Sequence, residues 1–404
     1  MSATGSARPP RVQAVLRAED EETVKPLELF FDLVFVLALT QCTQLMADIP
    51  TWEGLAKGLL VLGVLWWAWV GYAWLTSVIN PEEGAVRLVL FAVMGAFLVC
   101  ALCVPTVFDD AALTFAIAYA FVRFGQIALF EIASREQPEL RKSVNGLAVS
   151  TAVGVGLLAT ASALDGTAQG AMWATALALD WAGPYFFGAA GWKLVPSHFA
   201  ERHGLIVIIA LGESIVAIGA GVEGAITTGV VAAAVLGTAV AAAFWWLYFD
   251  VVAIVAERRL TNAEPGREQN EIARDSYSYL HFPMVAGIVL VALGMKKTLG
   301  DTGDPLKLVP AVAMLGGASM YLLAHVAFRL RNVHSLNRPR LVSSVLVLAL
   351  IPLATEIPAL ATLAILSAAA AGLVLYETIR YAEKREHIRH ELEHSTSFSR
   401  GRTG

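Results

Sequence analysis

The sequence predicts an all-α polytopic membrane protein with about twelve transmembrane helices. Of its 404 residues, 57% are hydrophobic and only 16% are charged. Apolar segments of about 20 residues, the length that crosses a hydrocarbon core about 30 Å thick, recur along nearly the whole chain. The longest polar connection inside the chain, at 256–275, is too short for a soluble domain that folds by itself. We therefore expect the helices themselves to carry the function.

Each expected span is an apolar run bounded by polar or charged residues. The eleventh run is shorter than a crossing helix usually is. In chain order the spans are 27–47, 54–79, 87–108, 111–133, 143–164, 168–190, 199–222, 226–254, 276–297, 306–330, 339–353 and 355–380.

The distribution of Lys and Arg predicts that both termini are cytoplasmic. These residues gather before the first span and after each even-numbered span, whereas acidic residues gather in the other connections. Loops that stay in the cytoplasm keep positive charge, so the protein is expected to be a multi-pass protein of the bacterial cytoplasmic membrane. The segments 1–26 and 381–404 are polar and are predicted to be cytoplasmic tails. The first has no apolar core with a cleavage site, so it is not expected to be a signal peptide.

Similar short segments occur in the same order in the two halves of the membrane region. For example, "FVLALTQ" at 35–41 aligns with "VIIALGE" at 207–213. Duplication is a common origin of transport folds. The sequence therefore predicts two six-helix repeats of parallel topology, at 27–190 and 191–380.

Two carboxylates interrupt the first span. Glu28 and Asp32 are four residues apart and so share one face of a helix. An ionisable side chain at membrane depth costs about 2.5–3.5 kcal/mol, and such groups usually have a partner or a function. The cation expected to pair with them is Arg123, near the middle of the fourth span.

The seventh span contains a second group of ionisable residues. On a helix His198, Arg202 and Glu213 lie on one side. Glu213 is deep in the span, between Gly212 and Ser214, and no basic residue lies within one helical turn. Proton coupling needs a carboxyl group that can gain and lose a proton, so Glu213 is the strongest candidate. The alternative is that it bonds to a neighbouring helix and only stabilises the bundle.

Other intramembrane polar residues are weaker candidates, for which a packing contact is the alternative. In "LDWAGP" Asp180 precedes Gly183 and Pro184, which can interrupt a helix beside a cavity. These weaker candidates are Asp180, Asp250, His281 and His325.

No enzyme signature is present, and we predict no cofactor and no metal. The sequence lacks a zinc helix, a nucleophile elbow and a glycine-rich phosphate loop. Its cysteines lie inside apolar spans, which does not indicate a disulfide framework. The expected partners are the lipid bilayer and a small ion or solute. A homo-oligomer is left open and no nucleic acid is expected.

Several blocks resemble the bacterial low temperature requirement protein A family. They include "LELFFDLVFVLALTQ", "HFAERHGLIVIIALGESIVAIG" and "YSYLHFPMVAGIVLVALGMK". The resemblance implies an integral membrane protein and supplies no settled biochemical activity. The first block is also similar to the opening helix of a family of potassium channels with a Phe-Ser-Asp motif. Phe30, Phe31 and Asp32 would match that motif, with Phe in place of Ser. The second half has no such aspartate. If the similarity is ancestral, the first and seventh spans would line a central pathway.

Three functions are compatible with these patterns. A proton- or ion-coupled secondary transporter explains the duplication, the deep Glu213 and the Gly-Pro pair. A cation channel explains the motif in the first span. A structural or stress-response membrane protein, or an intramembrane enzyme, is the third possibility. We expect a transporter and no enzymatic activity.

Overall fold

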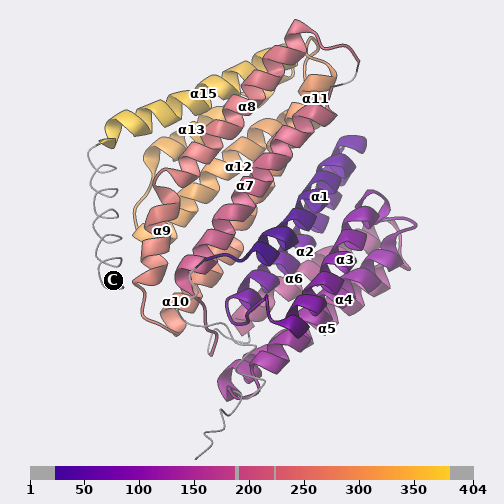
Figure 1. The fold of residues 1–404 in the computed structure, drawn as a ribbon. Helices are drawn as coiled ribbons and strands as arrows, with labels where there is room; N and C mark the ends of the chain where they lie inside the picture. The colour runs from indigo at the N-terminus through magenta and orange to yellow at the C-terminus, as the bar shows by residue number, and fades with distance from the viewer. Residues whose placement is uncertain (1–22, 187–190, 223, 383–404) are drawn as a thin grey trace, which may run out of the picture.

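The computed structural model describes residues 23–186, 191–222 and 224–382. Over these residues the chain forms helices and no β-strand, as the sequence predicts. Most of the long helices lie side by side in one bundle (Figure 1). The expected tails at 1–26 and 381–404 fall almost entirely outside the described residues.

The first half of the chain contains six long helices, several of which begin with recognisable signals. Pro26 opens the first helix, where its missing N–H would have no intrahelical partner, and the Thr51 hydroxyl caps the second by accepting from the Gly54 N–H. The helices are α1 (Pro26–Asp48), α2 (Trp52–Thr76), α3 (Gly84–Cys103) with the short η1 (Val104–Thr106), α4 (Ala112–Ala133), α5 (Pro138–Ala161) and α6 (Gly166–Phe186).

The second half is less regular. The helix α9 follows α8 directly, and the π-helical segment η2 joins α10 to α11. The elements are α7 (Pro196–Ala220), α8 (Thr228–Phe249), α9 (Val252–Thr261), α10 (Arg267–Ile272), η2 (Ala273–Tyr279), α11 (His281–Gly300), α12 (Leu308–Val333), α13 (Arg338–Ala349), α14 (Ile351–Ala354) and α15 (Ala359–Arg380).

Ten helical segments in the described part of the chain are long and apolar enough to cross a membrane. This supports a multi-pass membrane protein with fewer clear spans than the expected twelve. The two segments that fall short are α6, expected as 168–190, and the pair α13 and α14, expected as 339–353.

The helices of each half pack mainly among themselves. In the first half α1 contacts α2 and α3, and in the second α7 contacts α8 and α11. Figure 1 shows α1 to α6 on one side of the molecule and α7 to α15 on the other. The halves meet where α1 packs against α7 and α11. These three helices therefore form the centre of the interface between the halves, and α2 adds contacts with α7, α11 and η2.

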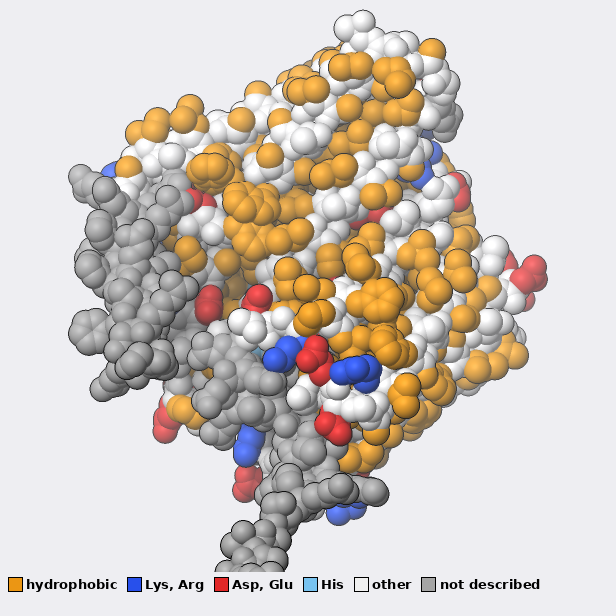
Figure 2. All heavy atoms as spheres, viewed as in Figure 1, with side chains coloured by type: hydrophobic (Ala, Val, Ile, Leu, Met, Phe, Trp, Pro, Cys, Tyr) orange, Lys and Arg blue, Asp and Glu red, His pale blue; other side chains and the backbone are white. Residues whose placement is uncertain are grey.

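The surface is suited to a hydrocarbon solvent. Hydrophobic side chains cover most of the face in Figure 2, interrupted in its lower part by a group of charged side chains. On α3 and α4, Leu88, Leu102 and Ile117 are more than half exposed, at 69%, 59% and 63%. Membrane-spanning helices direct such side chains into lipid, whereas a soluble monomer rarely exposes so many.

Candidate functional site

A buried charged cluster joins α1 to α7. The Arg202 guanidinium lies 3.1 Å from Glu28 Oε1 through Nη1 and 2.7 Å from Asp32 Oδ1 through Nη2. His198 Nε2 lies 2.9 Å from the same Glu28 oxygen. All four residues are at most 1% exposed. Buried charges are tolerated when they are paired and hydrogen-bonded, as they are here.

The local sequence explains this geometry. Glu28 and Asp32 occupy one face of α1 at a spacing of four residues, and His198 and Arg202 do the same on α7. Glu28 also accepts the Lys25 backbone N–H at 2.8 Å, so the same carboxylate caps the start of α1. Each helix therefore presents a pair of polar side chains to the other near its first turns.

A tryptophan from α2 completes the cluster. The Trp69 indole N–H donates to Asp32 Oδ1 at 2.8 Å, and the Arg202 guanidinium lies 5.7 Å from the centre of the Trp69 ring. Asp32 Oδ2 accepts no hydrogen bond from the described residues. Asp32 Oδ1 thus accepts hydrogen bonds from both Arg202 and Trp69, whereas Oδ2 accepts none from the described residues.

The expected pairing of Arg123 with Glu28 and Asp32 is wrong. Arg123 Nη2 lies 2.9 Å from Asp180 Oδ1, and Arg123 also donates to the Thr151 hydroxyl at 2.9 Å. The prediction matched the depths of the first and fourth spans, but depth does not determine which faces meet. The Arg123 face of α4 lies against α5 and α6, whereas the Asp32 face of α1 lies against α2 and α7.

A second polar layer lies further along the interface of α1, α7 and α11. Glu213 on α7, 1% exposed, accepts a hydrogen bond from the Thr40 hydroxyl on α1. Lys296 on α11 donates to the Gln44 side chain on α1 and is close enough to Glu213 for an electrostatic interaction. Nothing in the sequence indicated that Lys296 lies near Glu213, because this contact joins different helices. Between the charged cluster and this layer lie side chains with no exposed surface, namely Phe35, Leu39, Ile206, Val207 and Ala210.

The two polar layers show the relative direction of α1 and α7. Near the start of both helices Glu28 meets Arg202, and about three turns later Thr40 meets Glu213. Residue numbers increase in the same direction on both helices, so α1 and α7 are parallel neighbours.

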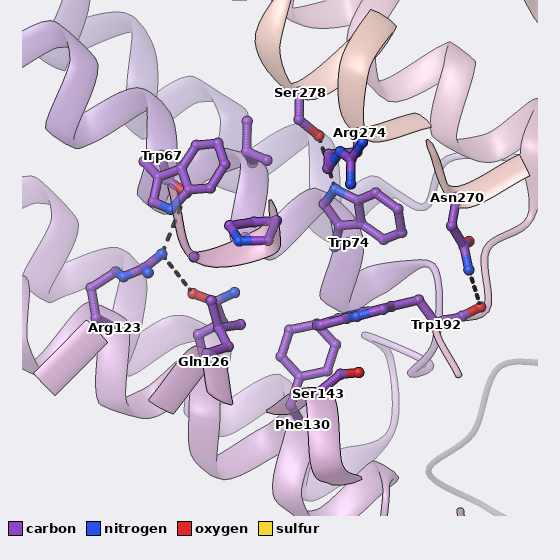
Figure 3. Close-up of a pocket in the computed structure, with 15 residues that line it drawn as sticks. Trp67, Trp74, Arg123, Gln126, Phe130, Ser143, Trp192, Asn270, Arg274 and Ser278 are labelled. Carbon is purple, nitrogen blue, oxygen red and sulfur yellow. Dashed lines mark hydrogen bonds between the residues drawn. The ribbon is translucent and has the colours of Figure 1, made fainter. Parts of the chain in front are cut away.

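A cavity of about 70 Å³ lies where α2, α4, α5 and α6 meet the π-helical segment. Figure 3 shows the aromatic side chains Trp67, Trp74, Phe130 and Trp192 around it, with Arg123 and Gln126 hydrogen-bonded at one side. The lining also includes Gly183, Pro184, Ser143, Asn270, Arg274 and Ser278. A few polar groups in an aromatic wall are typical of a site for a small solute.

The expected interruption at Gly183 and Pro184 is absent, since α6 continues through both residues to Phe186. Pro184 still cannot donate to the carbonyl of Asp180, four residues earlier. The regular helix pattern is instead broken in η2, whose Ser278 carbonyl accepts the Trp66 indole N–H at 2.9 Å. Single π-helical turns are frequent at functional sites.

Asp250 lies apart from the charged cluster, at the end of α8. It lines a larger cavity, of about 360 Å³, together with His325 on α12. Arg340 and Glu377, whose side chains are 2.7 Å apart, also line this cavity. Among the described residues no three His, Cys, Asp or Glu side chains gather as a metal ion would require.

Comparison with known proteins identifies the family. A family model described as "Bacterial low temperature requirement A protein (LtrA)" matches residues 23–375. The chain belongs to the LtrA family. A protein of Rhizobium meliloti (strain 1021), described as uncharacterized, is 29% identical over 324 residues, which are 76% of this chain and 78% of the relative. The chain matches no solved structure.

The LtrA match includes every residue of the charged cluster and both cavities except part of the wall near Glu377. The sequence singled out both members of each helix pair, but it did not show which acceptor each buried tryptophan would meet. The signal for Trp69 was its depth in a span, since a buried indole N–H needs an acceptor. Nothing in the sequence indicated the π-helical turn.

Proposed function

We propose that this LtrA protein is a proton-coupled secondary transporter of the bacterial cytoplasmic membrane, with Glu213 as the group that gains and loses the proton. The observation that carries the proposal is the α1–α7 interface, with polar layers at two levels and an apolar layer between them. Intramembrane carboxylates that face another helix commonly mark ion or proton pathways.

Protonation of Glu213 would change one of these layers and not the other. As a carboxylate it accepts from the Thr40 hydroxyl, whereas as a carboxylic acid it also donates a hydrogen bond. It would at the same time lose its attraction to Lys296. Protonation of Glu213 alone leaves the ion pairs around Arg202 in place, so the two ends of the interface can open at different times.

The cavity in Figure 3 is the proposed site for the transported solute. It lies against η2, which belongs to the second half of the chain, while most of its wall comes from the first half. Transporters commonly bind their substrate between repeats, beside irregular helices. Its size suits a small solute, whose identity the residues do not define.

We infer that α6 crosses the membrane even though it is less apolar than the other spans. α1 and α7 are parallel, so an even number of crossings must separate their starting points. Five clear spans, α1 to α5, precede α7, and α6 with 21 residues supplies the sixth.

The same reasoning applies to α13 and α14. The start of α13 lies beside the end of α15, because Arg340 pairs with Glu377. The start of α15 lies beside the connection between α11 and α12, because the Ala359 N–H donates to the Asp304 carbonyl at 2.9 Å. The chain from 338 to 358 therefore passes from one end of the bundle to the other. This gives twelve crossings and leaves both termini on one side, which we propose to be the cytoplasm.

Two further features support an internal duplication. The order of neighbours is the same in each half, since α3 contacts α4 and α4 contacts α5 as α11 contacts α12 and α12 contacts α13. In addition, a tyrosine hydroxyl bonds across to a backbone carbonyl in both halves. Tyr119 on α4 donates to Val64 on α2 at 3.3 Å, and Tyr321 on α12 donates to Phe244 on α8 at 2.6 Å.

The proposal is tested by proton flux in proteoliposomes. Internal pH is followed with a trapped dye while proton, sodium or potassium gradients are imposed. The parent protein should move protons, and Glu213→Gln should reduce the rate at least tenfold while leaving the yield of folded protein unchanged. Glu53→Gln is the matched control, because its carboxylate is 69% exposed and only pairs with Lys57. Absence of proton flux in the parent, or undiminished flux in Glu213→Gln, would refute the proposal.

A cation channel is the second candidate. It is favoured by the position of Asp32, which matches the channel motif and lies where α1 meets α7. A channel would give rapid, unsaturated potassium flux that is altered by Asp32→Asn and unaffected by Glu213→Gln. The same proteoliposomes distinguish the two functions.

A further inference from the structure

Three buried histidines on two helices of the second half and at the start of a third share one hydrogen-bonding pattern. In each, Nδ1 bonds to a backbone carbonyl of the preceding turn. A carbonyl can only accept, so Nδ1 carries the hydrogen and Nε2 is a bare acceptor. The bonds are His203 to Phe199 at 2.9 Å, His281 to Ser276 at 3.0 Å and His325 to Tyr321 at 2.9 Å.

These histidines form a row with two tyrosines. The ring centres of His203 and His281 are 5.2 Å apart, and Tyr277 stacks on His281 at 5.1 Å. Tyr248 donates its hydroxyl hydrogen to His281 Nε2 at 2.8 Å. The Tyr248 ring is in turn 6.0 Å from that of His325. All five residues are at most 2% exposed.

Several polar atoms of the row lack a partner. His203 Nε2, His325 Nε2 and the Tyr277 hydroxyl make no hydrogen bond with any described residue. Most buried polar atoms in proteins are bonded, so three unbonded ones in a single row need an explanation. Two of the three are acceptors that lack a hydrogen, and a mobile proton supplies one.

An acidic residue lies near each end of the row. At one end His203 packs edge-on against Trp69, with ring centres 5.1 Å apart, and the Trp69 indole bonds to Asp32. The Asp32 oxygen Oδ2 is itself unbonded. At the other end His325 lines the cavity of about 360 Å³ that also contains Asp250.

The row lies near one end of the bundle. Asp32 and His203 are within about two turns of the starts of α1 and α7, and Tyr248 and His325 are within about two turns of the ends of α8 and α12. These helix ends face the side that we assign to the cytoplasm. The row therefore runs across the bundle from the cytoplasmic-side cavity to the α1–α7 interface.

Few other charged groups face the row. Arg202 and His198 flank His203 on its own helix, and Arg340 on α13 faces His325. Glu257 on α9 is near enough to Tyr277 to interact with it.

We propose that this row conducts protons between the cavity beside Asp250 and Asp32 Oδ2, the carboxylate oxygen that is not hydrogen-bonded to any described residue. The proposal rests on proton coupling and adds the path by which protons reach the interface. At each histidine the proton binds the Nε2 lone pair and later leaves from the same nitrogen, while the Nδ1–H bond is kept. Tyr248 donates its hydroxyl proton to His281 Nε2, and its oxygen then accepts a proton that arrives from His325. The steps that are longer than a hydrogen bond require bridging water molecules.

The decisive variant is Tyr248→Phe, which keeps the ring and removes only the hydroxyl that joins two histidines. It should lower proton flux in proteoliposomes at least tenfold. Tyr72→Phe is the matched control, because Tyr72 is equally buried and its hydroxyl bonds only to the Val122 carbonyl at 2.7 Å. Equal proton flux in the parent and in Tyr248→Phe, with flux lost in Glu213→Gln, would refute proton conduction through the row. The same result would still support the proposed proton-coupled transporter.

A second measurement tests whether the histidines of the row can bind protons, even if the parent protein transports none. Nitrogen-15 NMR of histidine-labelled protein in lipid distinguishes a bare Nε2 from a protonated one. On acidification at least one histidine of the row should gain a proton, with a midpoint that moves in Tyr248→Phe and not in Tyr72→Phe. Spectra without protonation of His203, His281 or His325, assigned by single substitution, would then overturn the proposal.

Discussion

Replacement of Arg202 by methionine should destabilise the protein strongly. Its guanidinium makes charge-assisted bonds to Asp32 and Glu28 at 2.7 and 3.1 Å, each worth about 1.5–3 kcal/mol. The substitution leaves both carboxylates buried without the guanidinium, although Glu28 keeps its bonds to His198 and to the Lys25 N–H, and Asp32 keeps its bond to Trp69. Removing one member of a buried ion pair costs about 3–5 kcal/mol, so we expect the free energy of unfolding to fall by that amount. It can be measured by titrating SDS into mixed micelles and following tryptophan fluorescence.

The triple variant Glu28→Gln, Asp32→Asn, Arg202→Met separates charge from packing. It removes the uncompensated carboxylates together with the guanidinium, so it should regain about 2 kcal/mol or more relative to Arg202→Met alone. Arg267→Met is the control, because its side chain is 87% exposed and pairs with Glu271 on the surface, a contact worth at most about 1 kcal/mol. A triple variant no more stable than Arg202→Met would refute the view that uncompensated charge causes the loss.

The remaining predictions use the same unfolding assay or cysteine labelling. Arg123→Met should also cost about 3–5 kcal/mol, and adding Asp180→Asn should recover part of it; additive losses would contradict the pairing. Gly287→Ala should lower the free energy of unfolding by about 1–3 kcal/mol, because its Cβ would lie 2.6 Å from the Gly317 carbonyl oxygen. Gly372→Ala is the control: its Cβ would have no atom within 4 Å, so it should be neutral or stabilising by up to about 1 kcal/mol. Twelve crossings predict that single cysteines at 336 and 356, which lie before α13 and after α14, react with a membrane-impermeant maleimide from opposite sides. Labelling of both from one side would refute the crossing by α13 and α14.

The helices could be predicted from the sequence because a membrane selects for long apolar runs. Each of the ten clear spans overlaps an expected one, and most ends differ by a few residues. The largest differences are the start of Arg267–Gly300, nine residues before the expected 276, and the end of Thr228–Thr261, seven residues after the expected 254. The exceptions have physical causes. α6 is less apolar than its neighbours because it carries polar residues such as Gln169 and the Asp180 that pairs with Arg123, and α13 ends at Ala349 before the short α14. The π-helical turn is held by contacts with α2, such as the Trp66 bond to Ser278, that no local pattern encodes.

The sequence predicted the charged residues of the candidate site but not which of them pair. A spacing of four residues placed Glu28 beside Asp32 and His198 beside Arg202, since that spacing defines a helix face. It did not define which helix each face meets, and Arg123 was therefore assigned to the wrong carboxylates. Both cations and all three carboxylates had been identified, and the error lay in the pairing between helices. Pairing of this kind depends on how the halves pack, which a single sequence does not record.

The kinds of contact within and between the halves indicate where a transport motion would occur. Inside the second half, α11 and α12 approach so closely that a Cβ at Gly287 or Gly317 would meet backbone atoms at less than 3.0 Å. Such backbone contacts allow little sliding, because close-packed surfaces have few alternative arrangements. Between the halves, α1 is instead held to α7 and α11 by side-chain bonds, including those of Thr40 with Glu213 and of Lys296 with Gln44. A bond between side chains can be exchanged by a single proton, whereas a backbone contact cannot. The interface that the proposed proton would alter is therefore held at its polar layers by side-chain bonds, which is what the proposed proton-coupled transport requires.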